Sequence, residues 1–200
     1  MTEPEAQQVA EWITGGAQGD EQACAALYRA FSPAVLRLAL GLLGNSDDAE
    51  EVTQDTFVYA LRNLARFDPA RSAFTTWLFT IAISRCRNKR RRKWLQQLLP
   101  LETVEAEAQE QARRVVETLL ERRGVRRQVW EALQELPAHL REAVALRYLG
   151  GLRYKEIGQA LGCNPKTAES RVRVGLNGMR RALWARGVDV AEVWETLDVS

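Results

Sequence analysis

Apolar side chains recur along most of this chain three and four residues apart, which is the spacing of one face of an α-helix. No stretch alternates apolar and polar residues in the way that is typical of a strand. The pattern therefore predicts an all-α fold. In the first half of the chain it predicts a short helix over residues 5–13, two helices within 21–43, one over 47–67 and one that begins near residue 72.

Glycine, proline and capping residues predict where these helices end. The glycine pair at 15–16 is expected to break the first helix. Pro33 is expected in the first turn of the third helix, and Gly44 is expected to end that helix. Asn45 begins a capping cluster for the next helix, which the Asp-Pro pair at 68–69 stops.

The second half of the chain contains the most specific local pattern. Residues 125–136 form an apolar stripe that ends at Pro137, and a further helix over 138–149 is closed by the glycine pair at 150–151. A short helix then carries its apolar residues on one face and is broken at Gly162. Asn164 is suited to cap the following helix, and Pro165 is suited to its first turn.

Two short helices joined by a tight turn that contains glycine form a helix-turn-helix. The second helix is expected to bury Ala168, Val172, Leu176 and Met179. Another face of it carries basic and hydroxyl side chains, namely Lys166, Thr167, Ser170 and Arg171, beside Val174. Such a helix fits the major groove, so the sequence predicts duplex DNA as a partner.

The predicted architecture is two helical domains joined by a flexible linker. We assign residues 1–20 to an N-terminal extension, 21–95 to the first domain and 96–125 to a linker rich in Gln, Glu and Arg. Residues 126–186 form the second domain, which contains the helix-turn-helix. The tail 187–200 has an apolar strip and is expected to pack on that domain; the alternative is a regulatory latch or a docking segment for a partner.

The net charge of +2 conceals a segregation of signs. Residues 44–60 contain five acidic and no basic side chains, whereas residues 85–93 contain seven basic and no acidic ones. An acidic helix face repels DNA and favours a basic protein partner. The basic run favours an anion such as nucleic acid, so two different partner surfaces are expected.

Aromatic residues lie in sequence just before the basic run. Phe67, Phe74 and Trp77 could receive unstacked bases while nearby cations follow the phosphates, which is how single-stranded nucleic acid is bound. The alternative is that these rings belong to the core. We favour the core for Trp77, whereas both interpretations stay open for the two phenylalanines.

Other chemistry finds little support in the residues. Cys24, Cys86 and Cys163 are far apart and are expected to be reduced thiols, and the single His139 is expected to be ordinary surface. We expect no metal, no cofactor and no enzyme activity, because no catalytic set or phosphate loop is present. No apolar run is expected to span a bilayer, so no membrane insertion and a cytoplasmic location are expected.

Two segments together resemble a known family. DDAEEVTQDTFVYAL, from Asp47, and FTTWLFTIAISRCRNKRRR, from Phe74, resemble conserved region 2 of the bacterial sigma factors of the sigma-70 family, in their small extracytoplasmic-function group. The segment LPAHLREAVALRYLGGLRYKEIGQALGCNPKTAESRVRVGLNGMRRAL, from Leu136, resembles region 4. The likeness covers roughly residues 21–93 and 126–184, and two motifs in this order are far more specific than either alone.

The resemblance implies a factor that directs core RNA polymerase to promoters, through contacts with the β′ clamp helices and the β flap, and that is held inactive by an anti-sigma factor. It implies polymerase contacts at Asp47, Asp48, Glu51, Gln54, Asp55 and Phe57. It implies −10 element contacts at Asp68, Arg71, Ser72, Phe74, Thr75, Trp77, Ser84, Arg85, Arg87, Asn88 and Arg91. It implies −35 element contacts at Tyr154, Lys155, Lys166, Thr167, Glu169, Ser170, Arg171 and Arg173.

Two positions depart from what the resemblance leads one to expect. Ser84 stands where Asn is frequent, and Glu169 stands where a basic residue is common. Glu169 could pair with Arg173, accept from a cytosine amino group or repel phosphate. The alternative function is a helix-turn-helix regulator that acts without polymerase, against which the acidic helix argues because such a regulator needs no polymerase-docking face.

Overall fold

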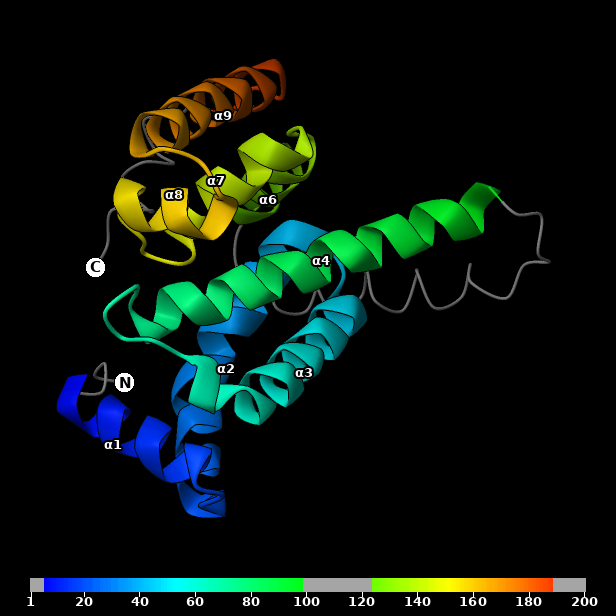
Figure 1. Cartoon of the computed structure of the whole chain (residues 1–200). Helices are drawn as coiled ribbons and strands as arrows, with labels where there is room; N and C mark the ends of the chain where they lie inside the picture. Colours follow the sequence, from blue (N-terminus) through cyan, green and yellow to red (C-terminus); the bar gives the residue numbers. More distant parts are fainter. Residues whose placement is uncertain (1–5, 99–123, 189–200) are drawn as a thin grey trace.

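In the computed structural model, which describes residues 6–98 and 124–188, every regular element is helical. The elements are α1 (Ala6–Ala17), α2 (Glu21–Leu43), α3 (Ser46–Arg62), the 3-10 turn η1 (Leu64–Arg66), α4 (Phe74–Leu98), α6 (Gly124–Gln134), α7 (Ala138–Tyr148), α8 (Tyr154–Leu161) and α9 (Pro165–Ala185) (Figure 1). The predicted all-α fold class is confirmed.

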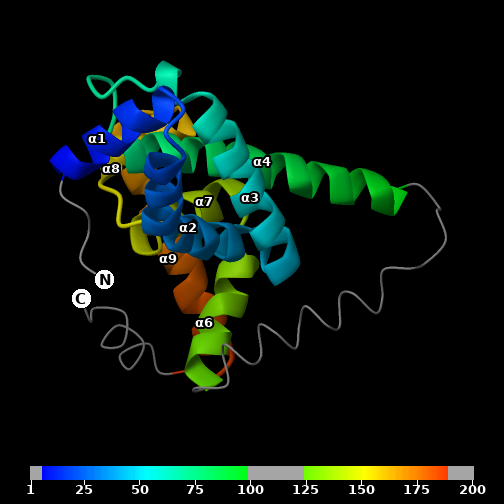
Figure 2. The same cartoon turned by 90° about the horizontal axis from the view of Figure 1, so that it is seen from below.

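The helices form two lobes. The N-terminal lobe comprises α1 to α4 and the C-terminal lobe comprises α6 to α9, with α4 running between the two groups in Figure 1. The far half of α4 extends beyond both lobes, as the second view also shows (Figure 2). The predictions for the linker and for the tail concern residues that lie mainly outside the described ranges.

Local capping explains several helix ends as predicted. Gly44 ends α2 with a left-handed backbone, at φ 69°, which glycine adopts without strain. The Asn45 side chain accepts from the Asp48 N–H at 2.9 Å and begins α3. The Asn164 side chain accepts from the Thr167 N–H at 2.7 Å and begins α9, with Pro165 in its first turn.

Three predicted boundaries are wrong. The helix α1 continues through Gly15-Gly16, because Gly16 lies against η1: a Cβ there would stand 2.8 Å from Leu64 Cδ1. The helix α2 is continuous through Pro33, which is exposed, while Val35 and Leu38 beyond it are fully buried. Burial on both sides of Pro33 outweighs the lost backbone hydrogen bond. The helix α3 ends at Arg62, and η1 fills the rest of the predicted span.

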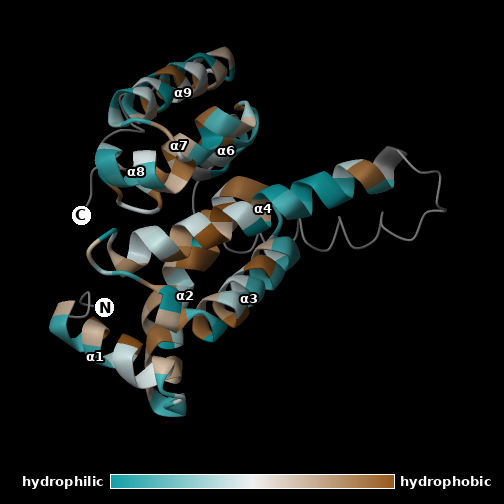
Figure 3. Ribbon diagram, in the orientation of Figure 1, coloured by the Kyte–Doolittle hydropathy of each residue, from teal (hydrophilic) through white to brown (hydrophobic). Residues whose placement is uncertain are grey.

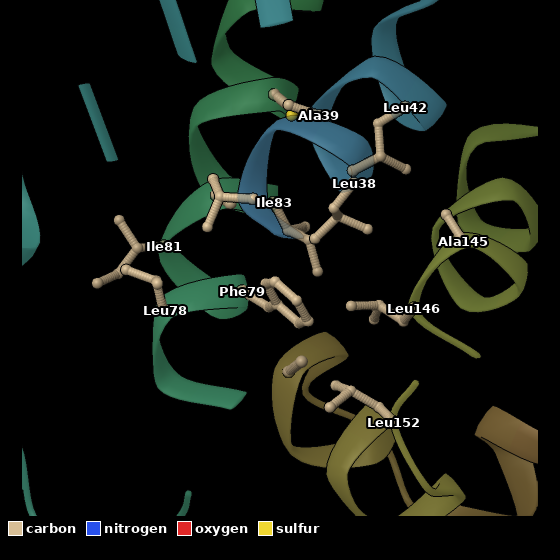
Figure 4. Packing of buried hydrophobic residues seen from close by; sticks show 14 of the residues in the cluster. Leu38, Ala39, Leu42, Leu78, Phe79, Ile81, Ile83, Ala145, Leu146 and Leu152 are labelled. Atoms are coloured by element: carbon tan, nitrogen blue, oxygen red, sulfur yellow. The ribbon is translucent and has the colours of Figure 1, made fainter. Parts of the chain in front are cut away.

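One apolar cluster crosses from the N-terminal lobe into the C-terminal lobe. Phe79 of α4, which is 1% exposed, faces Leu146 of α7, with Leu38 of α2 and Leu152 beside them (Figure 4). A second cluster, which includes Met179 and Leu183 of α9, belongs to the C-terminal lobe alone. The hydropathy view shows the same division, because α4 is apolar where the lobes meet and hydrophilic in its projecting half (Figure 3).

The helix α2 is long and apolar enough to cross a membrane, by length and composition alone, which the sequence analysis did not expect. Its packing gives another reason for that composition. It contacts α1, α3, α4, α6 and α7, and Val35, Leu38, Ala39 and Leu42 are fully buried. The helix α2 is thus the central core helix of the fold.

Candidate nucleic-acid interface

The acidic side chains of α3 divide into an exposed group and a paired one. Asp47, Glu51, Gln54 and Asp55 are exposed, and we call this group the acidic face of α3. Glu51 nevertheless pairs with Lys89 of α4. Asp47 and Asp55 make no ion pair within the described part of the chain, so their carboxylates can meet a basic partner.

Two of the predicted polymerase contacts do not lie on that face. Phe57 is 2% exposed and packs edge-on against Tyr28, with ring centroids 4.8 Å apart, so the prediction of a surface contact there is wrong. Asp48 is 8% exposed, and its carboxylate pairs with Lys89 at 3.4 Å and with Lys93. Asp48 therefore holds the basic part of α4 against α3.

A pocket of about 540 Å³ opens where α4 begins. It is lined by Arg66, Asp68, Arg71, Ser72, Thr76, Trp77, Thr80 and Gln159. Four predicted −10 residues therefore meet in one place: Asp68 and Arg71 are exposed, and Ser72 and Trp77 are half-buried. Thr75 is half-buried and is not among the residues that line this pocket. The hydroxyl of Thr76 is buried without a hydrogen-bond partner.

The aromatic residues beside the pocket form a cluster. Phe67 lies 5.4 Å from both Phe74 and Trp77, centroid to centroid. Phe74 is 5% exposed and also contacts Phe31 in the core, so the prediction of a direct DNA contact by Phe74 is wrong. Phe67 and Trp77 are half-buried and keep one part of each ring at the surface.

Along α4, the predicted strand-binding side chains follow in helical order. Ser84, Arg87, Asn88 and Arg91 are exposed. Arg85 is half-buried and lies over the Tyr59 ring, 5.0 Å from its centroid. Together with the residues that line the pocket, these side chains form a polar and cationic surface along α4, which we call the α4 surface.

The α4 surface is partly occupied by the C-terminal lobe. Arg87 donates two hydrogen bonds to Glu142 of α7, from Nε to Oε1 at 3.0 Å and from Nη2 to Oε2 at 2.7 Å. Arg90 Nη2 donates to Oε1 of the same carboxylate at 2.9 Å. Hydrogen bonding to Glu142 raises the pKa of Arg87, so this guanidinium stays charged.

The helix-turn-helix is formed by α8, the turn at Gly162 and α9. The predicted apolar face of α9 is confirmed at Ala168, Val172 and Met179, whereas Leu176 is half-buried. On the other face the exposed residues are Lys166, Glu169, Ser170 and Arg173, and the half-buried ones are Thr167 and Arg171. In α8, Lys155 is exposed and Tyr154 is half-buried. The guanidinium carbon of Arg147 lies over the Tyr154 ring, 5.2 Å from the ring centroid.

Four residues that join the two lobes were not predicted from the sequence, namely Glu142, Arg141, Gln134 and Gln159. A signal for Glu142 was present. It stands one turn before Ala145 and Leu146, on the buried face of α7, and a carboxylate in an apolar stripe needs a cationic partner. The identity of that partner was not readable, because Arg87 is 55 residues away in the chain.

The three cysteines and the single histidine form no common site. Cys86 is buried, Cys24 and Cys163 are half-buried, and none of the three is paired in a disulfide. His139 is exposed, as predicted. Within residues 6–98 and 124–188, no group of three His, Cys, Asp or Glu side chains could hold a metal ion.

Comparison with known families matches both lobes. The family model described as Sigma-70 region 2 matches residues 27–96, and the one described as Sigma-70, region 4 matches residues 126–176. The first match contains α3 and nearly all of α4. The second contains α7, α8 and the first half of α9.

Curated relatives agree over nearly the whole chain. The ECF RNA polymerase sigma factor SigK of Mycobacterium tuberculosis is 30% identical over 164 residues, which are 82% of this chain and 87% of the relative. The RNA polymerase sigma-H factor of Pseudomonas aeruginosa is 29% identical over 189 residues, which are 92% of this chain and 96% of the relative.

Solved structures share the fold. CnrH, in complex with the cytosolic domain of CnrY, superposes with a TM-score of 0.64 at 24% identity, over 90% of this chain and 99% of that one. The sigma factor RpoE from Bartonella quintana, in complex with the anti-sigma factor NepR, gives a TM-score of 0.61 at 22% identity, over 80% and 95% of the two chains.

The two lobes, the helix-turn-helix and the acidic and cationic surfaces define a DNA-binding transcription protein with a protein partner. With the family matches over both lobes, the chain belongs to the sigma-70 family of RNA polymerase sigma factors, in the extracytoplasmic-function group. As a sigma factor it directs promoter-specific initiation of transcription, as the resemblance of its motifs predicted.

Proposed function

We propose that the three surfaces described above divide the work of promoter recognition. The acidic face of α3, with Asp47, Gln54 and Asp55 exposed, docks on core polymerase, at its β′ clamp helices. Asp48 and Phe57 support that face from below. Complementary charge suits such a contact, because an acidic helix attracts a basic protein and repels DNA.

The α4 surface binds the melted −10 strand in this proposal. A base leaves the duplex stack and enters the pocket bordered by Arg71 and Trp77, while Arg87, Asn88 and Arg91 follow the phosphates. The Thr76 hydroxyl, buried without a partner, can hydrogen-bond a base edge there. Binding of the flipped base offsets an unstacking cost of a few kcal/mol.

The helix α9 reads the −35 duplex. Lys166, Ser170 and Arg173 are exposed near its beginning and can reach base edges and phosphates in the major groove. Glu169 is exposed beside them and suits a cytosine amino group. The exposure of these side chains on the side of α9 away from its buried residues Ala168, Val172 and Met179 is the observation that carries the proposal.

The remaining parts of the proposal follow from the family. The chain acts in the cytoplasm, without covalent chemistry of its own and without a cofactor. An anti-sigma factor regulates it, as the solved structure of RpoE with NepR suggests for a chain of the same fold. The helix α2 stays in the core and does not enter a membrane.

Run-off transcription tests the proposal. Purified core polymerase, with and without this chain, is incubated with fragmented DNA of the source genome, and the 5′ ends of the transcripts are mapped. New start sites that share an upstream motif pair are expected. If no start appears although α8–α9 binds DNA, the chain is instead a regulator that acts without polymerase.

Arg173→Ala tests the assignment of α9. Because Arg173 is exposed on the reading face, its loss is expected to weaken promoter binding by about 1–3 kcal/mol, or roughly 5- to 150-fold. Arg181→Ala removes the same charge from an exposed position two turns further along α9 and is the matched control. Binding of holoenzyme to the mapped promoter is measured by fluorescence anisotropy. Equal losses in the two variants would refute a specific role of Arg173.

A further inference from the structure

A buried carboxylate joins the two lobes. Glu142 of α7 is 3% exposed, and both of its oxygens accept from α4, where Arg87 contributes two hydrogen bonds and Arg90 one. We call these three residues the Glu142 clasp. A carboxylate this deeply buried is stable only while its cations remain in place, because an unpaired buried charge is strongly destabilising.

The C-terminal lobe also completes the end of α2. The last carbonyls of a helix lack partners within the helix and carry partial negative charge. Here Gln134 Nε2 donates to Gly41 O at 2.8 Å, and Arg141 Nη1 donates to Leu42 O at 3.2 Å. With the apolar contact of Phe79 and Leu146, these bonds make closure of the lobes a specific packing.

The Glu142 clasp uses the donors that nucleic acid would need. An arginine that binds a carboxylate with two parallel N–H groups presents the same fork to a phosphate. Arg87 is one of the residues that the proposed function assigns to the −10 strand. It cannot donate the same two N–H groups to Glu142 and to a phosphate at once.

We propose that Glu142 is an internal competitor of promoter DNA, so that closure of the lobes and binding of the −10 strand to the α4 surface exclude one another. This inference rests on the proposed function of the α4 surface. A phosphate that takes Arg87 leaves Glu142 with fewer cationic partners in a buried position, which drives the lobes apart. Opening exposes the carboxylate to water and removes that cost.

Closure acts on the two DNA surfaces differently. Gln159 of α8 lines the pocket and donates to Arg71 O at 3.2 Å, so the C-terminal lobe also stands at the entrance to the proposed base pocket. The reading side of α9 remains open, with Lys166, Ser170 and Arg173 exposed. The closed chain therefore occupies part of the −10 surface, namely the Arg87 guanidinium and one side of the pocket, whereas it leaves the reading side of α9 uncovered.

Two substitutions open the lobes by different means. Glu142→Gln removes the charge of the clasp and keeps the shape of the side chain. Gly41→Leu leaves the clasp intact and places a bulky side chain between the lobes, since even a Cβ at Gly41 would stand 2.3 Å from Leu149 Cδ1. Leucine is chosen because a rotation of Leu149 could make room for a single methyl group.

The control for charge is Glu135→Gln. Glu135 is exposed on the C-terminal lobe and pairs with Arg186 of the same lobe, so its loss changes the net charge equally without touching the interface. Each full-length chain is measured alone, without polymerase. Its radius of gyration is obtained by small-angle X-ray scattering, and its affinity for a fluorescent oligothymidylate is obtained by anisotropy at one fixed salt concentration.

Glu142→Gln and Gly41→Leu are both expected to enlarge the chain and to raise the affinity for the single strand by about five- to a hundredfold. Glu135→Gln is expected to match the wild type in size and to bind at most slightly more tightly. Circular dichroism verifies that the variants keep their helices. Should one of the two fail to fold, the other carries the test.

Three results would overturn the inference. The first is that Glu142→Gln behaves like Glu135→Gln in both measurements. The second is that both opening variants stay compact. The third is that a variant expands without any gain in affinity. Run-off transcription separates the causes: if the wild type still directs promoter-specific starts, only the clasp is refuted; if it directs none, the proposed function fails as well.

Discussion

Two carboxylates of this chain are nearly withdrawn from water, and each is held by two basic residues of α4. Asp48 pairs with Lys89 and Lys93 toward α3, whereas Glu142 pairs with Arg87 and Arg90 toward α7. The basic run predicted from the sequence is therefore not uniformly available to an anion. Four of its seven cations have acidic partners within the fold, and the exposed Arg91 and Arg92 lie beyond the clasp.

Burial also controls the chemistry of Cys86. Burial raises the pKa of the Cys86 thiol to about 12, so the native chain holds it as an unreactive thiol. Cys24 and Cys163 are half-buried. We expect iodoacetamide at pH 8 to modify Cys24 and Cys163 first and Cys86 only in urea, as measured by peptide mass spectrometry.

The same pKa shift predicts a dependence of stability on pH. Above about pH 9 the unfolded chain releases the Cys86 proton while the folded chain keeps it, so stability falls as pH rises toward 12. The loss is at most about 1.4 kcal/mol per pH unit. Cys86→Ala removes this contribution, and urea unfolding of both chains at pH 8 and 10 measures the difference. Equal pH dependence in the two chains would contradict the assigned burial.

At the scale of single helices, the helix ends that have a local cause were predictable from the sequence. The continuity of a helix through an unfavourable residue was not. Gly44, Asn45 and Asn164 act through their own backbone or side chain, and the sequence located all three. Gly16 and Pro33 are unfavourable within a helix taken alone. Both remain in helices because of neighbours distant in sequence, such as Leu64 against Gly16, and no local pattern contains that information.

Pro33 gives a prediction at this scale. It lacks the N–H of a helix interior and crowds the carbonyl one turn earlier, yet α2 is continuous around it. Pro33→Ala is expected to raise the free energy of unfolding by about 1–2 kcal/mol, after allowing for the greater freedom of the unfolded chain. Pro69→Ala, in the exposed turn before α4, is the control and should not raise it. Urea unfolding followed by circular dichroism measures both.

At the scale of the whole molecule, the unpredicted feature is that the lobes share a core. The sequence predicted each domain and the order of the surfaces, because those depend on periodicity and on charge within one helix. It did not predict that Phe79 packs on Leu146 or that Arg87 meets Glu142, since each contact joins residues more than fifty positions apart. The contact roles of Phe57 and Phe74 were implied by the family resemblance, while the sequence left the core open for Phe74; both rings are buried.

The shared core predicts coupled stability. Leu146 is fully buried in the cluster that crosses the lobes, so Leu146→Ala is expected to cost about 2–5 kcal/mol. Amide protection in the C-terminal half of α2 should fall with it. Leu183→Ala, in the cluster confined to the C-terminal lobe, should mainly affect α6, α7 and α9. Hydrogen exchange by mass spectrometry distinguishes these patterns; identical patterns would mean that the lobes are not coupled through Leu146.

The end of α4 at Leu98 and the start of α6 at Gly124 leave 25 residues, 99–123, between the lobes. Such a tether reaches at most about 80–90 Å when fully extended. A released C-terminal lobe therefore stays at an effective concentration on the order of millimolar around its own partner surface. Reclosure is consequently a first-order process, because both partners belong to one chain. A higher concentration of the protein therefore raises the open and closed forms by the same factor and leaves their ratio unchanged. A ligand that captures the open form, such as promoter DNA or core polymerase, does change the ratio between them.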